Sequence, residues 1–152
     1  MDMTLNPPLR LKLRTARILS VAVLAGLGIG YLGGAMFPDD DGGVWLGFSA
    51  LRLIGLFSAV LLFVDVRNQQ AHAPDTMLDE RQRAERDSAY VRAHQYIVGS
   101  LFIALFYTVP AQAFGWWLPD RDGIIDLVSA FAITSMAVPG MILAWRERSD
   151  EG

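Results

Sequence analysis

Four long apolar runs, separated by polar segments, constrain this chain more than any other feature. The runs cover residues 18–37, 44–64, 96–114 and 124–145. Each holds about 20 residues, enough for a helix to cross the roughly 30 Å of hydrocarbon in a bilayer. None shows the period-2 alternation of a strand, and unpaired strand edges are excluded from hydrocarbon. The sequence therefore predicts an all-α fold, a single integral membrane four-helix bundle over residues 1–152.

Basic residues are unevenly distributed among the polar segments. The segment before the first apolar run has four, residues 65–95 have five, and the segment after residue 145 has two. The segments 37–43 and 115–123 have none and one. Basic residues that flank short loops stay in the cytoplasm. We therefore expect a multi-pass protein of the plasma membrane, the bacterial inner membrane, with both termini and the central segment cytoplasmic.

A competing interpretation of residues 10–35 is a cleavable signal peptide, with Gly33 and Ala35 as the small residues at the cleavage site. The apolar run is long for a signal peptide, and its glycines also have a packing interpretation. We therefore expect the segment to be retained. Cleavage would leave the orientation of the other three helices unchanged.

The first apolar run carries a small residue at every fourth position: Ala22, Gly26, Gly30 and Gly34. This spacing lines up a flat groove on one helix face, where another helix can approach closely. The partner can be the second, third or fourth helix, or another copy of the chain.

Two charged residues fall inside the apolar runs near the expected outer boundary. Arg52 lies about 10 Å below that boundary, and Asp126 lies close to it on the fourth helix. An arginine facing lipid costs about 2.5–3.5 kcal/mol. We expect Arg52 to pair with Asp126 inside the bundle, with Asp39–Asp41 or a lipid phosphate as alternative partners. A structural pair or a snorkelling side chain is favoured over a transport site.

The two short outer loops share the pattern Pro-Asp-x-Asp-Gly, at residues 38–42 and 119–123. Duplication of a helical hairpin would explain the pattern. Convergent turn chemistry, in which Asp caps the following helix, explains it more simply. A calcium site is conceivable, but neither loop has the spacing of a known calcium loop, so no metal site is predicted. The carboxylates in question are those of Asp39, Asp41, Asp120 and Asp122.

Residues 76–95 form the only long polar segment, and they predict a helix that continues into the third apolar run. Thr76 is the expected N-cap, and Asp79 completes a near capping box. Opposite charges recur at i,i+4 along this segment. We expect one helix from about Thr76 to Phe114, a cytoplasmic extension of the third spanning helix, with Pro110 bending or ending it.

The run Asp79-Glu80-Arg81, followed by Arg86 and by small and aromatic residues, resembles a family of small bacterial and archaeal four-span membrane proteins of uncharacterised function. In that family the Asp-Glu-Arg motif precedes the third helix on the cytoplasmic side. The resemblance covers about twenty residues and the overall helix plan. It implies a fold and a location, and it supplies no activity.

Residues able to carry chemistry are few. The chain has no cysteine, and its two histidines, His72 and His94, do not provide enough ligands for a zinc site or a haem pair. No glycine-rich loop precedes a helix as a phosphate cradle would. Basic residues in the central segment alternate with acids, which argues against nucleic acid. Asp65 and Arg92 are expected to pair the second helix with the third. We therefore predict no enzyme and no cofactor.

Two functions from different classes fit these features. The first is a membrane anchor, sensor or accessory subunit that binds a cytoplasmic or membrane protein through Asp79, Glu80, Arg81 and Arg86. The second is a small channel or transporter, oligomeric through the glycine face, that uses Arg52, Asp126 and a kink at Pro139-Gly140 in the fourth helix.

Overall fold

The computed structural model describes residues 9–37 and 42–147, and within these ranges the fold is all-helical, as predicted. The helices are α1 (Leu13–Met36), α2 (Gly43–Phe63), α3 (Val66–His72), α4 (Glu80–Phe114) and α5 (Arg121–Arg146), with a short 3₁₀ helix η1 (Asp75–Met77). Four of them, α1, α2, α4 and α5, are long and apolar enough to cross a membrane. The fold therefore indicates a multi-pass membrane protein.

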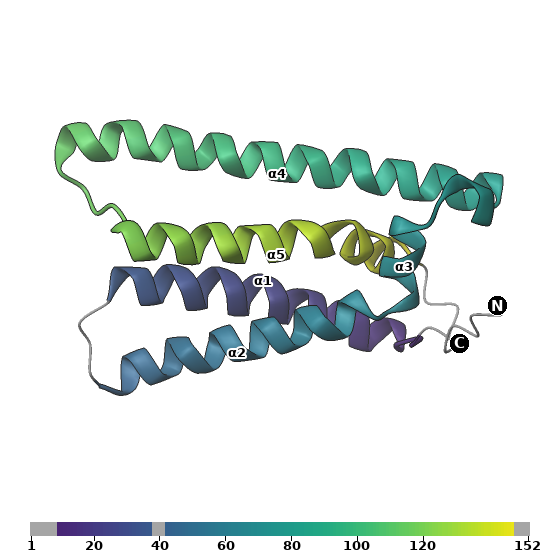
Figure 1. Cartoon of the computed structure of the whole chain (residues 1–152), viewed down its shortest axis with the longest axis horizontal. Coiled ribbons are helices and arrows are strands. Elements are labelled where there is room, and N and C mark those ends of the chain that lie inside the picture. Colours follow the sequence, from purple (N-terminus) through teal and green to yellow (C-terminus); the bar gives the residue numbers. More distant parts are fainter. Residues whose placement is uncertain (1–8, 38–41, 148–152) are drawn as a thin grey trace, which may run out of the picture.

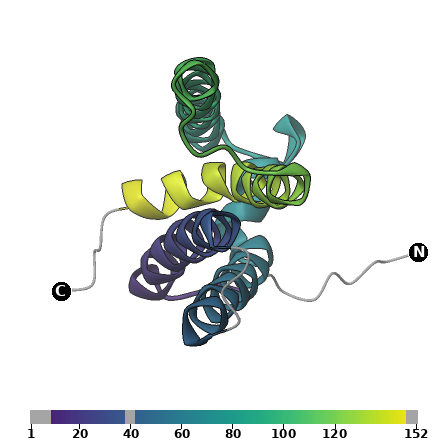
Figure 2. The same ribbon diagram turned by 90° about the vertical axis from the view of Figure 1, so that its left-hand side faces the viewer.

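The four long helices run up and down beside one another, and α5 lies between α1 on one side and α4 on the other (Figure 1). The N-terminal segment, α3, η1 and the end of α5 share one end of the molecule, called here the termini end. The end of α1, the start of α2 and the α4–α5 connection lie at the opposite end, called here the loop end. In the end-on view α4 stands at the edge, away from α2 (Figure 2). Helices α1, α2 and α5 therefore form the core, and α4 packs on α5 and α3.

Helices α1 and α2 cross closely at two glycines, Gly26 and Gly55. A Cβ atom on Gly26 would lie 2.6 Å from the carbonyl oxygen of Leu51 and 2.7 Å from the Cα of Gly55. A Cβ on Gly55 would lie 2.7 Å from the backbone nitrogen of Leu27. Since each of these atoms belongs to backbone, the two helices touch main chain to main chain, as small residues permit in membrane helices.

The start of α4 differs from the prediction: Asp79, not Thr76, is the N-cap. The Asp79 carboxylate accepts a hydrogen bond from the Gln82 amide at 2.7 Å, and the Gln82 side chain accepts one from the Asp79 amide at 3.2 Å. Thr76 lies in η1 instead. Leu78 between them is extended and buried in the bundle, so the helix cannot run through it. The reciprocal Asp79–Gln82 bonds satisfy two backbone amides at the start of the helix.

The far end of α4 lies at Phe114, as predicted, and of the two effects expected of Pro110, termination does not occur. The helix continues for another turn to Phe114. Gly115 then adopts the left-handed conformation, with φ of 68°, and its amide bonds to the Ala111 carbonyl. A glycine tolerates this conformation without steric cost, so the stop signal is Gly115.

Helix α5 bends in its last part, near the internal Pro139. In Figure 2 its yellow final part runs across the view, whereas its green first part is seen end-on. Proline removes one helical hydrogen bond and pushes away the preceding turn. Helix α3 packs into this region, where a Cβ on Gly140 would lie 2.8 Å from the Asn68 side-chain oxygen. The bend therefore makes room for α3.

Candidate functional site

The structure brings Arg52 and Asp126 together across α1. Arg52 Nη1 lies 3.1 Å from Asp126 Oδ2, and Arg52 Nε donates to the Gly30 carbonyl at 3.0 Å. The guanidinium also sits over the Tyr31 ring, 4.5 Å from its centre. Arg52 thus links α2 to both α1 and α5, because its guanidinium contacts the Asp126 carboxylate, the Gly30 carbonyl and the Tyr31 ring. This arrangement supports a structural role for the pair. The alternative partners Asp39–Asp41 lie outside the described residues.

The small-residue face of α1 is occupied by α2 and by the Arg52 side chain. A Cβ on Gly30 would lie 2.9 Å from Arg52 Cγ, and one on Gly34 would lie 2.8 Å from Arg52 Cζ. Gly26 is covered by the α2 backbone, and Ala22 is half-buried. The glycines therefore serve two purposes, a close helix crossing and a passage for the arginine.

A buried polar junction closes the termini end. Asp65 and Arg67 are 1% and 5% exposed. Asp65 accepts a hydrogen bond from the Leu11 amide at 3.0 Å and pairs with Arg67 at 3.1 Å. Arg67 also donates to Glu147 and to the Leu11 carbonyl. The prediction that Asp65 pairs with Arg92 is therefore wrong: α3 begins directly after Asp65, which turns the carboxylate toward the N-terminal segment.

This junction stabilises the protonated form of Arg67. Burial alone lowers the pKa of Arg67, but its hydrogen bonds to Glu147 and Asp65 outweigh burial and raise the pKa above its ordinary value. Arg17 reinforces the same region by donating to the carbonyls of Ala144 and Glu147 at 3.1 and 2.7 Å. The N-terminal segment, the α2–α3 turn and the end of α5 are thereby joined by charge-assisted hydrogen bonds.

A second polar cluster holds the extension of α4 against α3 and η1. Arg86 pairs with Asp75 at 2.6 Å and with Asp87 at 2.8 Å, and it donates to the Ala73 carbonyl at 2.9 Å. The hydrogen bond from Arg86 lowers the pKa of Asp75. Beneath this cluster, Ala89 of α4 is buried in a small apolar group with residues of α3 and α5. The extension is therefore fixed to the body of the molecule on one side.

The four residues predicted to bind a partner have different positions in the structure. Asp79 caps α4, and Arg86, with a side chain only 14% exposed, braces the α3–α4 hairpin. Glu80 is exposed. The Arg81 side chain is 88% exposed and pairs with Glu85 at 3.0 Å on the same helix. Asp79, Glu80 and Arg81 are thus all exposed, although the Asp79 carboxylate is engaged in the helix cap, and only Arg86 is mostly covered.

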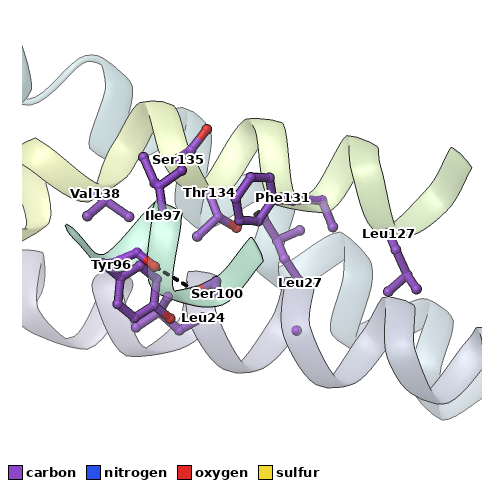
Figure 3. A pocket seen from close by; sticks show the side chains of 12 residues that line it. Leu24, Leu27, Tyr96, Ile97, Ser100, Leu127, Phe131, Thr134, Ser135 and Val138 are labelled. Atoms are coloured by element: carbon purple, nitrogen blue, oxygen red, sulfur yellow. Dashed lines mark hydrogen bonds between the residues drawn. The ribbon is translucent and has the colours of Figure 1, made fainter. Parts of the chain in front are cut away.

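An apolar groove of about 200 Å³ lies between α1, α4 and α5 (Figure 3). Four residues of the lining carry a hydroxyl group: Tyr96, Ser100, Thr134 and Ser135. The serine and threonine hydroxyls each donate to a backbone carbonyl of their own helix, so their hydrogens are not directed into the groove. Ser100 donates to Tyr96, Thr134 to Ala130 and Ser135 to Ala132, each at 2.8 Å. Apart from these four residues the lining is apolar or glycine: Leu24, Leu27, Gly28, Ile97, Leu127, Ala130, Phe131 and Val138. Sequence patterns gave no signal for this groove, since it depends on how far α4 stands from α1.

The α4–α5 connection uses its aspartate as turn chemistry predicts. Asp120 accepts a hydrogen bond from the Gly123 amide at 2.8 Å and so caps α5. A carboxylate oxygen used in this way is a poor start for a calcium site. Of the other three carboxylates considered, Asp122 lies in the first turn of α5, and Asp39 and Asp41 lie outside the described residues.

None of the protein families, curated proteins and solved structures compared with the chain matches it.

Proposed function

We propose that the chain is a non-enzymatic protein of the bacterial inner (plasma) membrane, with both termini cytoplasmic, that binds a protein partner through the extension of α4. Support for the orientation comes from the distribution of charge. Eleven of the thirteen basic residues fall before residue 18, between residues 65 and 95 or after residue 145, whereas the segment 115–123 holds one arginine and two aspartates. Positive charge beside short loops favours the cytoplasmic side. The termini-end basic residues include Arg10, Lys12, Arg14, Arg17, Arg67 and Arg146.

The observation that carries the binding proposal is that α4 projects past α1 and α2 at the termini end while remaining braced (Figure 1). Arg86 and Ala89 fix one face of the extension to α3 and η1. The other face presents Glu80 and Arg81 to solvent. A charged surface held in one conformation loses little entropy on binding, so it is suited to recognition.

Site-specific photo-crosslinking tests this proposal. A photoreactive residue replaces Ala84, which is exposed between Arg81 and Arg86, and the protein is irradiated in native membranes. We expect one adduct of constant mass, lost in the Glu80→Ala/Arg81→Ala variant. The matched control, Arg121→Ala/Asp122→Ala at the loop end, retains it. An adduct that survives the Glu80/Arg81 change, in a variant with unchanged thermal stability, contradicts the proposal.

A small oligomeric channel or transporter is the second candidate, supported by the bend of α5 at Pro139 beside the open groove. Because α2 and Arg52 fill the glycine face of α1, an oligomer has to form through a different face. Solute or ion flux through proteoliposomes tests this function. Flux that exceeds protein-free vesicles and falls on Arg52→Gln supports it, and flux equal to protein-free vesicles rejects it.

A further inference from the structure

The groove between α1, α4 and α5 has the chemistry of a hydrocarbon site. The hydroxyls of Ser100, Thr134 and Ser135 donate to backbone carbonyls, and the rest of the lining is apolar apart from the phenol of Tyr96. A polar ligand would leave its own groups unsatisfied there, at a high cost in free energy. An acyl chain has no such groups. Gly28 leaves the groove open, since a Cβ at this position would meet nothing within 4 Å.

Two arginines lie at the end of the groove nearest the termini. Arg146 of α5 donates to the Ser88 hydroxyl of α4 at 2.9 Å. Arg92 follows Ser88 by one helical turn and precedes Tyr96, which lines the groove, by one turn. Both arginines are exposed, and within residues 9–37 and 42–147 neither forms an ion pair with a carboxylate.

The carboxylates near this point are already engaged. Asp87 pairs with Arg86 at 2.8 Å, and Glu147 pairs with Arg67. Among residues 9–37 and 42–147, no carboxylate therefore pairs with Arg92 or Arg146. An anion bound between the two arginines would balance their charge. The apolar groove begins at Tyr96, one helical turn after Arg92.

We propose that this site binds one anionic phospholipid, with an acyl chain in the groove and the headgroup phosphate between Arg92 and Arg146. The proposal rests on the membrane location proposed above. A net negative headgroup fits better than a zwitterionic one, because no ammonium group competes with the arginines for the phosphate. Each arginine near a membrane surface favours an anionic lipid by about fivefold, so the pair gives roughly 25-fold.

Native mass spectrometry of the full chain in mixed micelles tests the site. The micelles contain equal amounts of dioleoyl phosphatidylglycerol and dioleoyl phosphatidylcholine. We expect wild-type protein to retain mainly one phosphatidylglycerol. Arg92→Gln/Arg146→Gln reduces that preference by at least tenfold, Arg92→Lys/Arg146→Lys keeps it, and Arg81→Gln, on the same helix but away from the groove, keeps it too.

A second pair of variants tests the groove. Gly28→Leu fills it and is expected to remove adducts of both lipids. Gly47→Leu is the matched control, because a Cβ at Gly47 of α2 also meets nothing within 4 Å and Gly47 is not part of the lining. Inorganic phosphate at millimolar concentration is expected to give no thermal stabilisation, which separates a lipid from a free anion.

Several results overturn the proposal: an unchanged preference in Arg92→Gln/Arg146→Gln, full adducts in Gly28→Leu, or stabilisation by phosphate alone. Failure of the membrane location has a different signature, since the chain would then purify as a monodisperse soluble protein without detergent. Failure of partner binding is separate again, because it is read from the Ala84 crosslink in variants whose arginines at positions 92 and 146 are intact.

Discussion

The glycine crossing of α1 and α2 predicts that adding a single methyl group at Gly26 destabilises the fold. The new Cβ would lie 2.6 Å from the Leu51 carbonyl oxygen, about 0.8 Å short of the 3.4 Å at which ordinary contact begins. The opposing atoms are backbone, so no side chain can rotate away and the helices have to separate. Overpacking of this kind costs about 1–3 kcal/mol. The higher helix propensity of alanine returns up to about 1 kcal/mol.

A matched variant removes the propensity contribution. Gly47→Ala makes the same chemical change in α2, where the new Cβ meets nothing within 4 Å. We therefore expect Gly47→Ala to be neutral or stabilising, and Gly26→Ala to be less stable than Gly47→Ala by about 1–3 kcal/mol. Reversible unfolding in mixed micelles with increasing SDS, followed by circular dichroism, measures both. A difference below about 0.5 kcal/mol, or a more stable Gly26→Ala, would refute the crossing geometry.

Three further predictions follow from the polar clusters. Arg67→Gln leaves Asp65 buried without its cation and is expected to lower the free energy of unfolding by about 3–5 kcal/mol. The exposed control Arg81→Gln is expected to change it by less than about 1 kcal/mol. The same SDS titration measures both variants, and equal effects contradict the buried junction. Arg52→Gln and Asp126→Asn are expected to be coupled by about 0.5–1 kcal/mol in a double-mutant cycle, since both side chains are partly exposed; strictly additive effects argue against the pair. The hydrogen bond from Arg86 lowers the pKa of Asp75, so its stabilisation of the α3–α4 hairpin is present above the ordinary pKa of 3.8 and is lost as the pH falls through the lower folded pKa. Carboxyl-carbon NMR should show the Asp75 pKa rising toward 3.8 in Arg86→Gln. An unchanged pKa in that variant contradicts the hydrogen bond between Arg86 and Asp75.

The helical plan could be predicted from the sequence because hydrophobic length is a local property. The four apolar runs correspond to α1, α2, α4 and α5, and the turn pattern around Asp120 correctly predicts a helix cap. The start of α4 was predicted wrongly at Thr76 because the burial of Leu78 depends on residues distant in the sequence. The local sequence pattern carries no information about such contacts.

Less of the candidate sites than of the fold could be predicted from the sequence. Arg52 and Asp126 were predicted to meet because lipid leaves few partners for a charge. The Asp65–Arg67–Glu147 junction was missed, since the short helix α3 reorients Asp65 and no periodicity in the sequence predicts that turn. The role of Gly55 was also missed, because a lone glycine in an apolar run carries no pattern of its own.

The buried junction at the termini end has a consequence for biogenesis. Its members are made far apart in time: Leu11 emerges from the ribosome early, Asp65 and Arg67 follow after two helices, and Glu147 comes after two more. Until Glu147 is synthesised, Arg67 lacks one of its two carboxylates, so the first helical pair waits in a partly assembled form. A nascent chain stalled before this residue is therefore expected to be a substrate for membrane quality-control proteases, whereas the released chain is not.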